Sequence, residues 1–238
     1  MMAAEAQRYV VIGLGGVGGI VLRMLVPYLF HRNEDACVYA IDGDSFEEKN
    51  RGRQHFERLG PKAVVLSEEL GAAYGDRVTI VPVPEYITPQ RARFAISEGD
   101  VVFCTPDNHS TRRVVESRCR RLRDVALFSG GNDGVEDGNT GTYGNAQVYL
   151  RSNGNNITNP LSHFHPEIRK PADQLPTQQG CGVATTSAPQ LLFTNLAVAS
   201  TLLGAFYSWC QGELDCEEIY LDILTGRSVP VRRPLAEP

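Results

Sequence analysis

The residues with the clearest chemical meaning are glycines near the amino terminus. Gly13, Gly15, Gly16 and Gly18 stand in the order Gly-Leu-Gly-Gly-Val-Gly, directly after a β-branched run at residues 8–12. Glycines let a turn approach a phosphate closely, and the helix that follows supplies free N–H groups and a positive dipole end. The pattern therefore indicates a phosphate-binding turn between a strand and a helix. It does not distinguish a dinucleotide from ATP, although the chain has no Gly-Lys-Ser/Thr sequence and hence no P-loop.

A second group of polar residues follows the next expected strand, residues 37–41. Asp42 ends that strand, where an acid commonly accepts hydrogen bonds from ribose hydroxyls. Arginine gives a triphosphate bidentate contacts, whereas a hydride-transfer site gains little from a guanidinium at this place. The segment therefore favours ATP over a nicotinamide cofactor. Its other candidate nucleotide-binding residues are Asp44, Asn50, Arg53 and Gln54.

Two further charged positions complete the candidate site. Lys62 opens an expected helix and adds a cation. Asp107 and Asn108 follow the fourth expected strand, residues 100–104, and Arg112 comes shortly after them. A carboxylate at the carboxyl end of a strand, opposite the phosphates, is well placed to hold Mg²⁺. These residues predict a site for ATP and Mg²⁺, with Asp107 as the metal ligand.

Taken in order, the motifs resemble those of the ThiF/MoeB superfamily, which includes the adenylation domains of ubiquitin-activating enzymes. The glycine turn is similar to the family's Gly-x-Gly-Gly-x-Gly, and residues 42–54 are similar to its Asp-x-Asp-(x)₅-Asn-x-x-Arg-Gln. Lys62 stands where the family has a lysine after a Gly-x-Pro-like start. Residues 107–112 are similar to its Asp-Asn-(x)₃-Arg. The resemblance covers about residues 9–150.

The resemblance implies a role for each of these residues. Gly16 and its neighbours would contact the phosphates, Asp42 would hold the ribose, and Asp107 would bind Mg²⁺. The implied reaction is attack of a C-terminal glycine carboxylate on the α-phosphorus, with release of pyrophosphate. The implied substrate is a small ubiquitin-like or sulfur-carrier protein. The triphosphate contacts would come from Asn50, Arg53 and Lys62.

Three features depart from the family. No Cys-x-x-Cys pair is present, so we expect no structural zinc, and we interpret His163 and His165 as loop histidines. Only seven residues precede Arg8, so the arginine that family members lend across a dimer is missing or comes from elsewhere. A distinct partner chain or the expected helix at residues 111–123 could supply it. The chain is also too short for a separate catalytic-cysteine domain.

Cys181 is the candidate acyl acceptor. It stands in Gly-Cys-Gly, at the end of an irregular segment and before a long helix. A thiol in such a loop can be exposed and its thiolate stabilised, which would allow a thioester. The alternative is an inert residue, because free cysteines are usually buried packing groups. Cys104 and Cys119 are interpreted as packing residues.

The elements that must position these residues form an alternating pattern of strands and helices. Such alternation predicts a Rossmann-like α/β fold, with a doubly wound, mostly parallel sheet and helices on both faces. After it we expect a crossover loop, a long helix at residues 189–209 and a small C-terminal hairpin. We predict one adenylation domain with three parts: a nucleotide-binding core (1–150), the crossover loop (151–187), and the C-terminal helix and hairpin (188–238).

Composition narrows the possible partners and locations. The 238 residues carry 23 Lys+Arg against 28 Asp+Glu, a net charge of −5, so nucleic acid is an unlikely partner. The apolar stretch at 189–209 is interrupted by polar residues and predicts a buried helix rather than a membrane span. Six scattered cysteines favour a reducing cytoplasm. By resemblance, we expect a homodimer, or a heterodimer whose partner supplies the missing arginine.

Other functions stay open at this point. The chain could be a non-catalytic nucleotide-binding subunit that partners an active homologue. It could also adenylate a peptide or an RNA-linked carboxylate. A nicotinamide dehydrogenase is less consistent, because residues 42–54 would then have no role.

Overall fold

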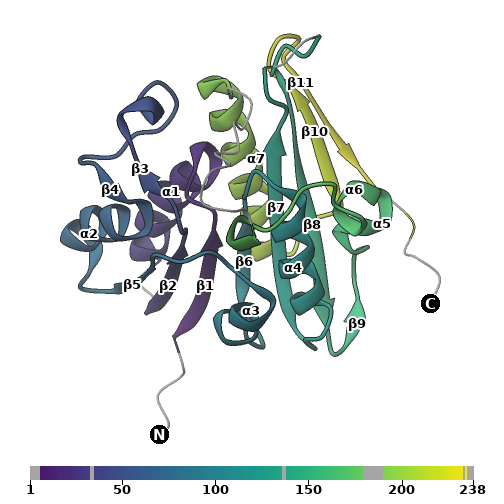
Figure 1. Cartoon of the computed structure of the whole chain (residues 1–238). Helices are drawn as coiled ribbons and strands as arrows, with labels where there is room; N and C mark the ends of the chain where they lie inside the picture. The colour runs from purple at the N-terminus through teal and green to yellow at the C-terminus, as the bar shows by residue number, and fades with distance from the viewer. Residues whose placement is uncertain (1–5, 33–34, 136–137, 179–189, 233, 235–238) are drawn as a thin grey trace, which may run out of the picture.

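Helices cover both faces of one nine-stranded sheet in a computed structural model of the chain (Figure 1). The structure describes residues 6–32, 35–135, 138–178, 190–232 and 234. The strands of the sheet are β1 (Gln7–Ile12), β2 (Ala36–Ile41), β5 (Val78–Val83), β6 (Val101–Cys104), β7 (Val125–Asn132), β8 (Tyr143–Ser152), β9 (Asn155–Asn156), β10 (Glu218–Asp222) and β11 (Arg227–Val231). The helices are α1 (Gly16–His31), α2 (Lys62–Tyr74), α3 (Pro89–Ala95), α4 (His109–Cys119), α5 (Leu161–Phe164), α6 (Pro166–Arg169) and α7 (Leu192–Cys210).

The sheet has a parallel part and an antiparallel part. Its order is β11-β10-β8-β7-β6-β1-β2-β5, with β9 paired to β8. The pairs between β5 and β7 are all parallel, whereas β8, β10 and β11 extend the sheet in antiparallel register. The predicted Rossmann-like, mostly parallel fold with a C-terminal hairpin is therefore confirmed. The hairpin strands β10 and β11 belong to the main sheet.

Successive side chains of β1 point into two different hydrophobic cores, one on each face of the sheet. Tyr9 and Val11 pack into the core under α1, α2 and α7, whereas Val10 and Ile12 pack into the core under α3 and α4. Successive residues of a strand point to opposite faces, so a continuous apolar strand fits only a sheet covered on both sides. This burial holds β1 in the middle of the molecule.

The strand order places a switch point between β1 and β6. From β1 the chain moves outward to β2 and β5, and it then returns to β6 and β7 on the other side. Ligands of open α/β sheets bind outside the carboxyl ends of the strands at such a point. The glycine turn follows β1 and the segment carrying Asp107 follows β6, so both lie at this edge.

The segment after β8 contains short elements that periodicity does not reveal. A strand of two residues (β9), two helices of four (α5, α6) and a 3-10 turn (η2, Pro176–Gln178) occupy residues 155–178. Asp173 anchors the segment, because its carboxylate accepts from the N–H groups of His109 (2.7 Å) and Ser110 (2.8 Å) at the start of α4. The segment therefore packs against α4 beside the carboxyl edge.

Two helices differ in length from the sequence-based expectation. α4 begins at His109 and ends at Cys119 instead of spanning residues 111–123. Leu122 turns into the core after it, and its N–H donates to the Cys119 carbonyl. α7 spans Leu192–Cys210 and packs along α1. Within the described ranges no helix has the combined length and apolar character of a membrane span.

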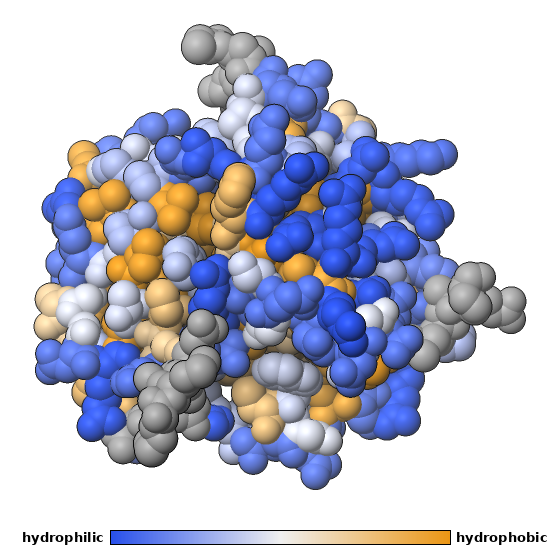
Figure 2. All heavy atoms as spheres, turned by 90° about the horizontal axis from the view of Figure 1, so that it is seen from below, coloured by the Kyte–Doolittle hydropathy of each residue, from blue (hydrophilic) through white to orange (hydrophobic). Residues whose placement is uncertain are grey.

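The amino edge of the sheet lies on the other side of the molecule from the carboxyl edge. Figure 2 shows the molecule from below, where the amino ends of the parallel strands lie, with hydrophobic and hydrophilic residues interspersed.

The minor sheet of β3 (Ser45–Phe46) and β4 (Gly60–Pro61) joins the segment after β2 to the start of α2. It draws residues 42–62 together at the carboxyl edge.

Candidate functional site

A cavity of about 1020 Å³ lies at the carboxyl edge of the parallel strands. It is lined by the glycine turn, the segment after β2, the start of α2, the loop after β6 and the ends of β7 and β8. Small-molecule sites usually measure about 300–1,000 Å³. The cavity therefore has room for a nucleotide and for part of a second substrate.

The backbone geometry of the glycine turn requires glycine at two of its positions. Gly13 has a φ of +82°, which favours glycine, and its N–H donates to the Ile41 carbonyl at 2.9 Å. A Cβ on Gly18 would lie 1.8 Å from the Gly13 carbonyl oxygen. α1 begins at Gly16 without a side-chain cap, so the N–H groups of its first turn have no capping partner among the described residues. The turn can therefore bind an anion.

Asp42 ties the glycine turn to the end of β2. Its carboxylate accepts from the N–H groups of Leu14 (2.5 Å) and Asp44 (2.7 Å). Burial raises the pKa of Asp42 to about 6, although the charge of Lys62 opposes the shift. A carboxylate held in this way faces the cavity with its position set by two backbone donors.

Lys62 and Asp44 form an ion pair beside Asp42. The distance between Lys62 Nζ and Asp44 Oδ2 is 3.0 Å, and the Lys62 side chain is only 6% exposed. The Tyr86 hydroxyl donates to the other oxygen of Asp44. Burial would raise the pKa of Asp44, but the charge of Lys62 and these hydrogen bonds hold it below its usual value. Sequence reasoning missed Tyr86, which follows β5 and meets Asp44 only through the fold.

The remaining polar residues of the segment have separate tasks. Asn50 Oδ1 accepts from the Glu47 N–H at 3.0 Å and so closes the turn η1 (Glu48–Asn50). Arg53 Nε and Gln54 Oε1 are buried, and neither has a hydrogen-bond partner within the part of the chain that the structure describes. Unpaired buried polar groups are costly, so a ligand that satisfies them would bind favourably. Arg53 and Gln54 both line the cavity.

The loop after β6 forms the opposite wall. Asp107 lines the cavity, and Asn108 Oδ1 caps α4 by accepting from the Thr111 N–H at 2.8 Å. Arg112 is buried and donates to Ser129 Oγ (3.1 Å) and to the carbonyls of Pro106 (3.0 Å) and Gly130 (2.9 Å). Burial lowers the pKa of Arg112. Its guanidinium therefore holds the Asp107 loop against the end of β7.

Apart from Gly18, the predicted site residues that the structure describes all line one cavity. Residues 1–216 match the model of the ThiF family. The chain belongs to the ThiF family. The family that the ordered motifs predicted is therefore confirmed.

Solved structures share the fold of this ThiF-family chain at low identity. PaaA superposes with a TM-score of 0.63 and 15% identity, over 95% of this chain and 64% of that one. MccB of E. coli solved with MccA gives 0.67 and 13%, over 98% and 66%. MccB solved with ATP gives 0.65 and 13%, over 95% and 63%. The chain thus spans less than two thirds of the length of these proteins. No curated protein matches it.

This ThiF-family chain also has a polar cluster that the motifs do not include, at what we call the far end of the cavity, where His165, Glu167 and Asn132 line it. His165 Nε2 lies 2.8 Å from Glu218 Oε1, and its Nδ1 lies 3.0 Å from Glu167 Oε1. Burial acts to lower the pKa of His165, but its bonds to the two glutamates raise it overall. Asn132 lines this end, and its two amide atoms are buried with no partner among the described residues. This end could hold the polar main chain of a second substrate.

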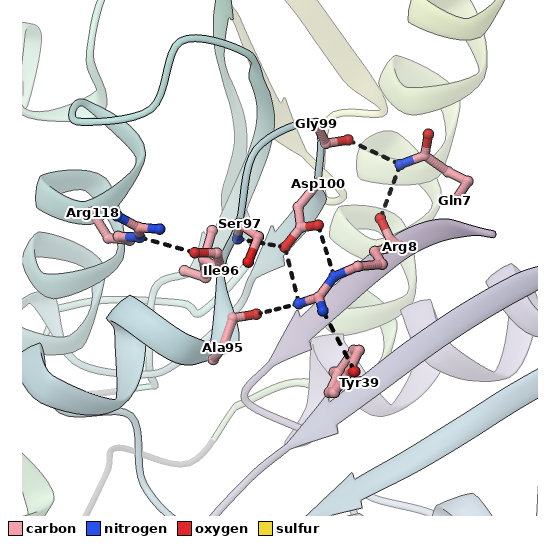
Figure 3. A network of polar contacts seen from close by, with 9 residues as sticks. All are labelled: Gln7, Arg8, Tyr39, Ala95, Ile96, Ser97, Gly99, Asp100 and Arg118. Atoms are coloured by element: carbon pink, nitrogen blue, oxygen red, sulfur yellow. Dashed lines mark hydrogen bonds and ion pairs between the residues drawn. The ribbon is translucent and has the colours of Figure 1, made fainter. Parts of the chain in front are cut away.

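Arg8 lies far from the cavity. It is in β1 at the amino edge of the sheet, as expected for the start of that strand. Figure 3 shows its guanidinium bound to Asp100, with Nε 3.0 Å from Oδ1, and to the Ala95 carbonyl. Its charge also lies over the Tyr39 ring, 4.6 Å from the centroid. Arg8 therefore stabilises the packing of β1, α3 and β6.

The last candidates from the sequence are the cysteines and a possible metal site. Cys104 and Cys119 are fully buried, as expected of packing residues, and burial raises the pKa of Cys104 to about 12. Cys181 lies outside the described residues. Among the described residues, no group of three or more His, Cys, Asp or Glu side chains is arranged to hold a metal ion.

Proposed function

We propose that this protein adenylates a carboxylate with ATP and Mg²⁺. The observation that carries the proposal is the set of residues that line the cavity at the carboxyl edge. An uncapped helix terminus, the buried acid Asp42, the cations Arg53 and Lys62, and the carboxylate Asp107 all face it. A dinucleotide needs the first two features, whereas the two cations and the opposing carboxylate suit a triphosphate with its metal.

The residues fit this nucleotide. The free N–H groups of α1 would bind phosphate, and Asp42 would accept from the ribose hydroxyls. Arg53, with its buried and unpartnered Nε, would donate to phosphoryl oxygens. Lys62 already neutralises Asp44 and would add its remaining donors to the same phosphates. Asp107 would bind Mg²⁺, which supplies charge neutralisation at the phosphates when bound.

In the proposed reaction, an oxygen of the substrate carboxylate forms a bond to the α-phosphorus. The bond from that phosphorus to the bridging oxygen breaks, and pyrophosphate leaves with the electron pair. The product is a mixed acyl–phosphate anhydride. No proton transfer is required, so the protein's contribution is to orient the two reactants and to stabilise negative charge with Arg53 and Lys62.

For the substrate, we propose the C-terminal carboxylate of a small ubiquitin-like or sulfur-carrier protein. The far end of the cavity, with Asn132 and Asn145 on its wall, suits an extended main chain, because amides donate and accept together. A peptide carboxylate is the second candidate. The specific observation in its favour is that MccB, which shares the fold, has been solved with MccA. An RNA-linked carboxylate and a non-catalytic subunit remain the alternatives.

ATP–pyrophosphate exchange tests the proposal. The purified chain should exchange labelled pyrophosphate into ATP only when a carboxylate substrate is present, and a C-terminal amide of the same substrate should give none. Asp107→Ala should abolish exchange while the protein stays folded, because the change removes a metal ligand and no internal contact of the core. Normal exchange by Asp107→Ala would remove that residue from the mechanism. ATP binding without exchange for any carboxylate would instead favour a non-catalytic subunit.

We further propose that Cys181 can accept the acyl group as a thioester. In that step the thiolate attacks the acyl carbon, and AMP leaves. Cys181→Ala should then keep pyrophosphate exchange but lose a protein adduct that thiols cleave. An adduct that forms in Cys181→Ala would show that Cys181 is not the acceptor.

A further inference from the structure

The carboxamide of Asn195 is buried without a partner beside the phosphate-binding turn. Asn195 lies in the first turn of α7 and is 0% exposed. Neither its Nδ2 nor its Oδ1 has a hydrogen-bond partner in the described part of the chain. The neighbouring Thr194 is equally buried, but its Oγ1 donates to the Gly141 carbonyl at 2.7 Å. A buried amide that makes no hydrogen bond is costly and points to a missing partner.

Asn195 occupies the space beside Gly16 that a side chain would otherwise fill. A Cβ built on Gly16 would lie 2.1 Å from Asn195 Nδ2 and 2.7 Å from its Cγ. Gly16 is the first residue of α1 and lines the cavity. By contrast, the atom nearest to a Cβ on Gly15 lies at an ordinary 3.8 Å. The requirement for glycine at position 16 therefore comes from Asn195.

The amino terminus of α1 lacks the groups that usually satisfy a helix end. It has no side-chain cap and no acidic residue in its first turn. Free N–H groups and a positive dipole end therefore meet an unpartnered carboxamide at one place. An anion bound there would accept from these N–H groups and from Nδ2 of the carboxamide. Asp42, which would hold the ribose, lies at the end of β2, so the anion at α1 would be the phosphate part of the nucleotide.

We propose that Asn195 is a nucleotide-contacting residue whose Nδ2 donates to a phosphoryl oxygen of ATP at the start of α1. The proposal rests on the proposed function, because it takes ATP as the ligand of the glycine turn. It assigns α7, which packs on α1, β7 and β8, to the phosphate site.

Calorimetric titration of the whole chain with ATP and, separately, with adenosine tests the proposal. Asn195→Asp keeps the shape of the side chain but replaces the donor with an acceptor. It should weaken ATP binding about 10-fold or more and leave adenosine binding within about twofold, because Asn195 lies beside Gly16, at the end of α1 that would bind the phosphates. Equal weakening of both ligands, or unchanged ATP affinity, would overturn the proposal.

If the buried carboxylate of Asn195→Asp prevents folding, a second pair of variants tests the same proposal. Gly16→Ala should lower the Tm, because its methyl group collides with the carboxamide. Asn195→Ala in the same chain should restore most of the Tm, because it removes the colliding carboxamide without placing a glycine in α7, but it should not restore the affinity for ATP, since the donor is gone. Full recovery of ATP affinity in the double variant would refute the phosphate contact. If the wild-type chain itself binds no ATP, the proposed function fails, whereas tight binding that is insensitive to position 195 refutes only this inference.

Discussion

Two arginines of the cavity wall show that residue type does not decide a role. Arg53 has a buried Nε with no partner among the described residues, so its guanidinium is available to a ligand. Arg112 spends its donors on Ser129 and on two backbone carbonyls. Both belong to motifs that predict nucleotide binding. We therefore infer that Arg53 contributes to affinity and that Arg112 contributes mainly to stability.

The first prediction separates these two roles. Arg53→Ala should weaken ATP binding about 10- to 100-fold and leave the Tm close to that of the wild type, because Arg53 Nε has no hydrogen-bond partner among the described residues to lose. Arg112→Ala should lower the free energy of unfolding by about 2–4 kcal/mol, because it leaves a buried cavity and unpaired acceptors. Thermal denaturation and calorimetric titration measure the two effects. A large loss of stability in Arg53→Ala would contradict the assignment.

The second prediction concerns the raised pKa of Asp42. Its pKa rises from 3.8 in the reference state to about 6 in the folded chain, so the folded state holds this proton more tightly than the unfolded state. The contribution of Asp42 to stability is therefore greatest below pH 4 and declines as the pH rises to about 6. The ionised carboxylate of Asp42 is the better acceptor for a hydrogen bond from a ribose hydroxyl. ATP affinity should therefore fall as the pH is lowered through about 6. Titrations between pH 5 and 8 test this; Asp42→Asn should lack the dependence.

At the scale of secondary-structure elements, the glycine turn and α1 form one unit that close backbone contacts hold together. Gly13 turns with a positive φ, Gly18 approaches its carbonyl, and Gly16 accommodates Asn195. Of these, Gly18 has the least tolerance, because a Cβ there would lie 1.8 Å from a backbone atom, whereas the backbone atom nearest to a Cβ on Gly13 is 2.8 Å away. A flexible side chain could move aside, whereas the turn cannot move without losing its bond to Ile41.

The third prediction compares two glycines inside helices. Gly18→Ala should destabilise the chain strongly, because its Cβ would lie 1.8 Å from the Gly13 carbonyl oxygen. Gly71→Ala in α2 is the matched control: apart from its chain neighbours and the backbone of its own helix, no described atom lies within 4 Å of its new Cβ. It should stabilise the chain by about 0.5–1 kcal/mol, the gain from replacing glycine with alanine in a helix. Chemical denaturation measures both. A folded Gly18→Ala chain of wild-type stability would refute the packing argument.

Over the whole molecule, α7 presents an exposed apolar side. Its buried residues cover the sheet, but Leu192, Phe193 and Leu196 at its start are exposed. Large exposed apolar side chains that lie together commonly mark an interaction surface. Because these exposed apolar side chains lie together and the resemblance implies a homodimer, we propose that a second copy of the chain docks there.

The fourth prediction tests this dimer. Phe193→Glu should convert the dimer to a monomer, because a charge on a 71% exposed apolar residue prevents its burial against another copy. Phe94→Glu on α3 is the matched control: Phe94 is 83% exposed and should not change the oligomeric state. Light scattering after size-exclusion chromatography gives the mass of each. A wild-type monomer, or a dimer that survives Phe193→Glu, would contradict the proposed interface.

Local features of the sequence predicted most of the sheet and one wall of the site. Apolar runs of five or six residues predict buried strands, and the glycine turn follows the first of them. The sequence brings Asp42 and Asp107 to one edge, because each follows a parallel strand and parallel strands end together. The short helices α5 and α6 were not predictable, since four residues are too few for a period to appear.

By itself the sequence determined the order of strands and helices, the glycine turn and the family, because each depends on residue types at short spacing. Only the tertiary structure decided which of two arginines is free, that Tyr86 meets Asp44, and that Asn195 lies against Gly16. Asn195 and Gly16 are far apart along the chain and meet only when α7 packs on α1. The availability of a polar group depends on whether such distant partners satisfy it, and no local pattern records that.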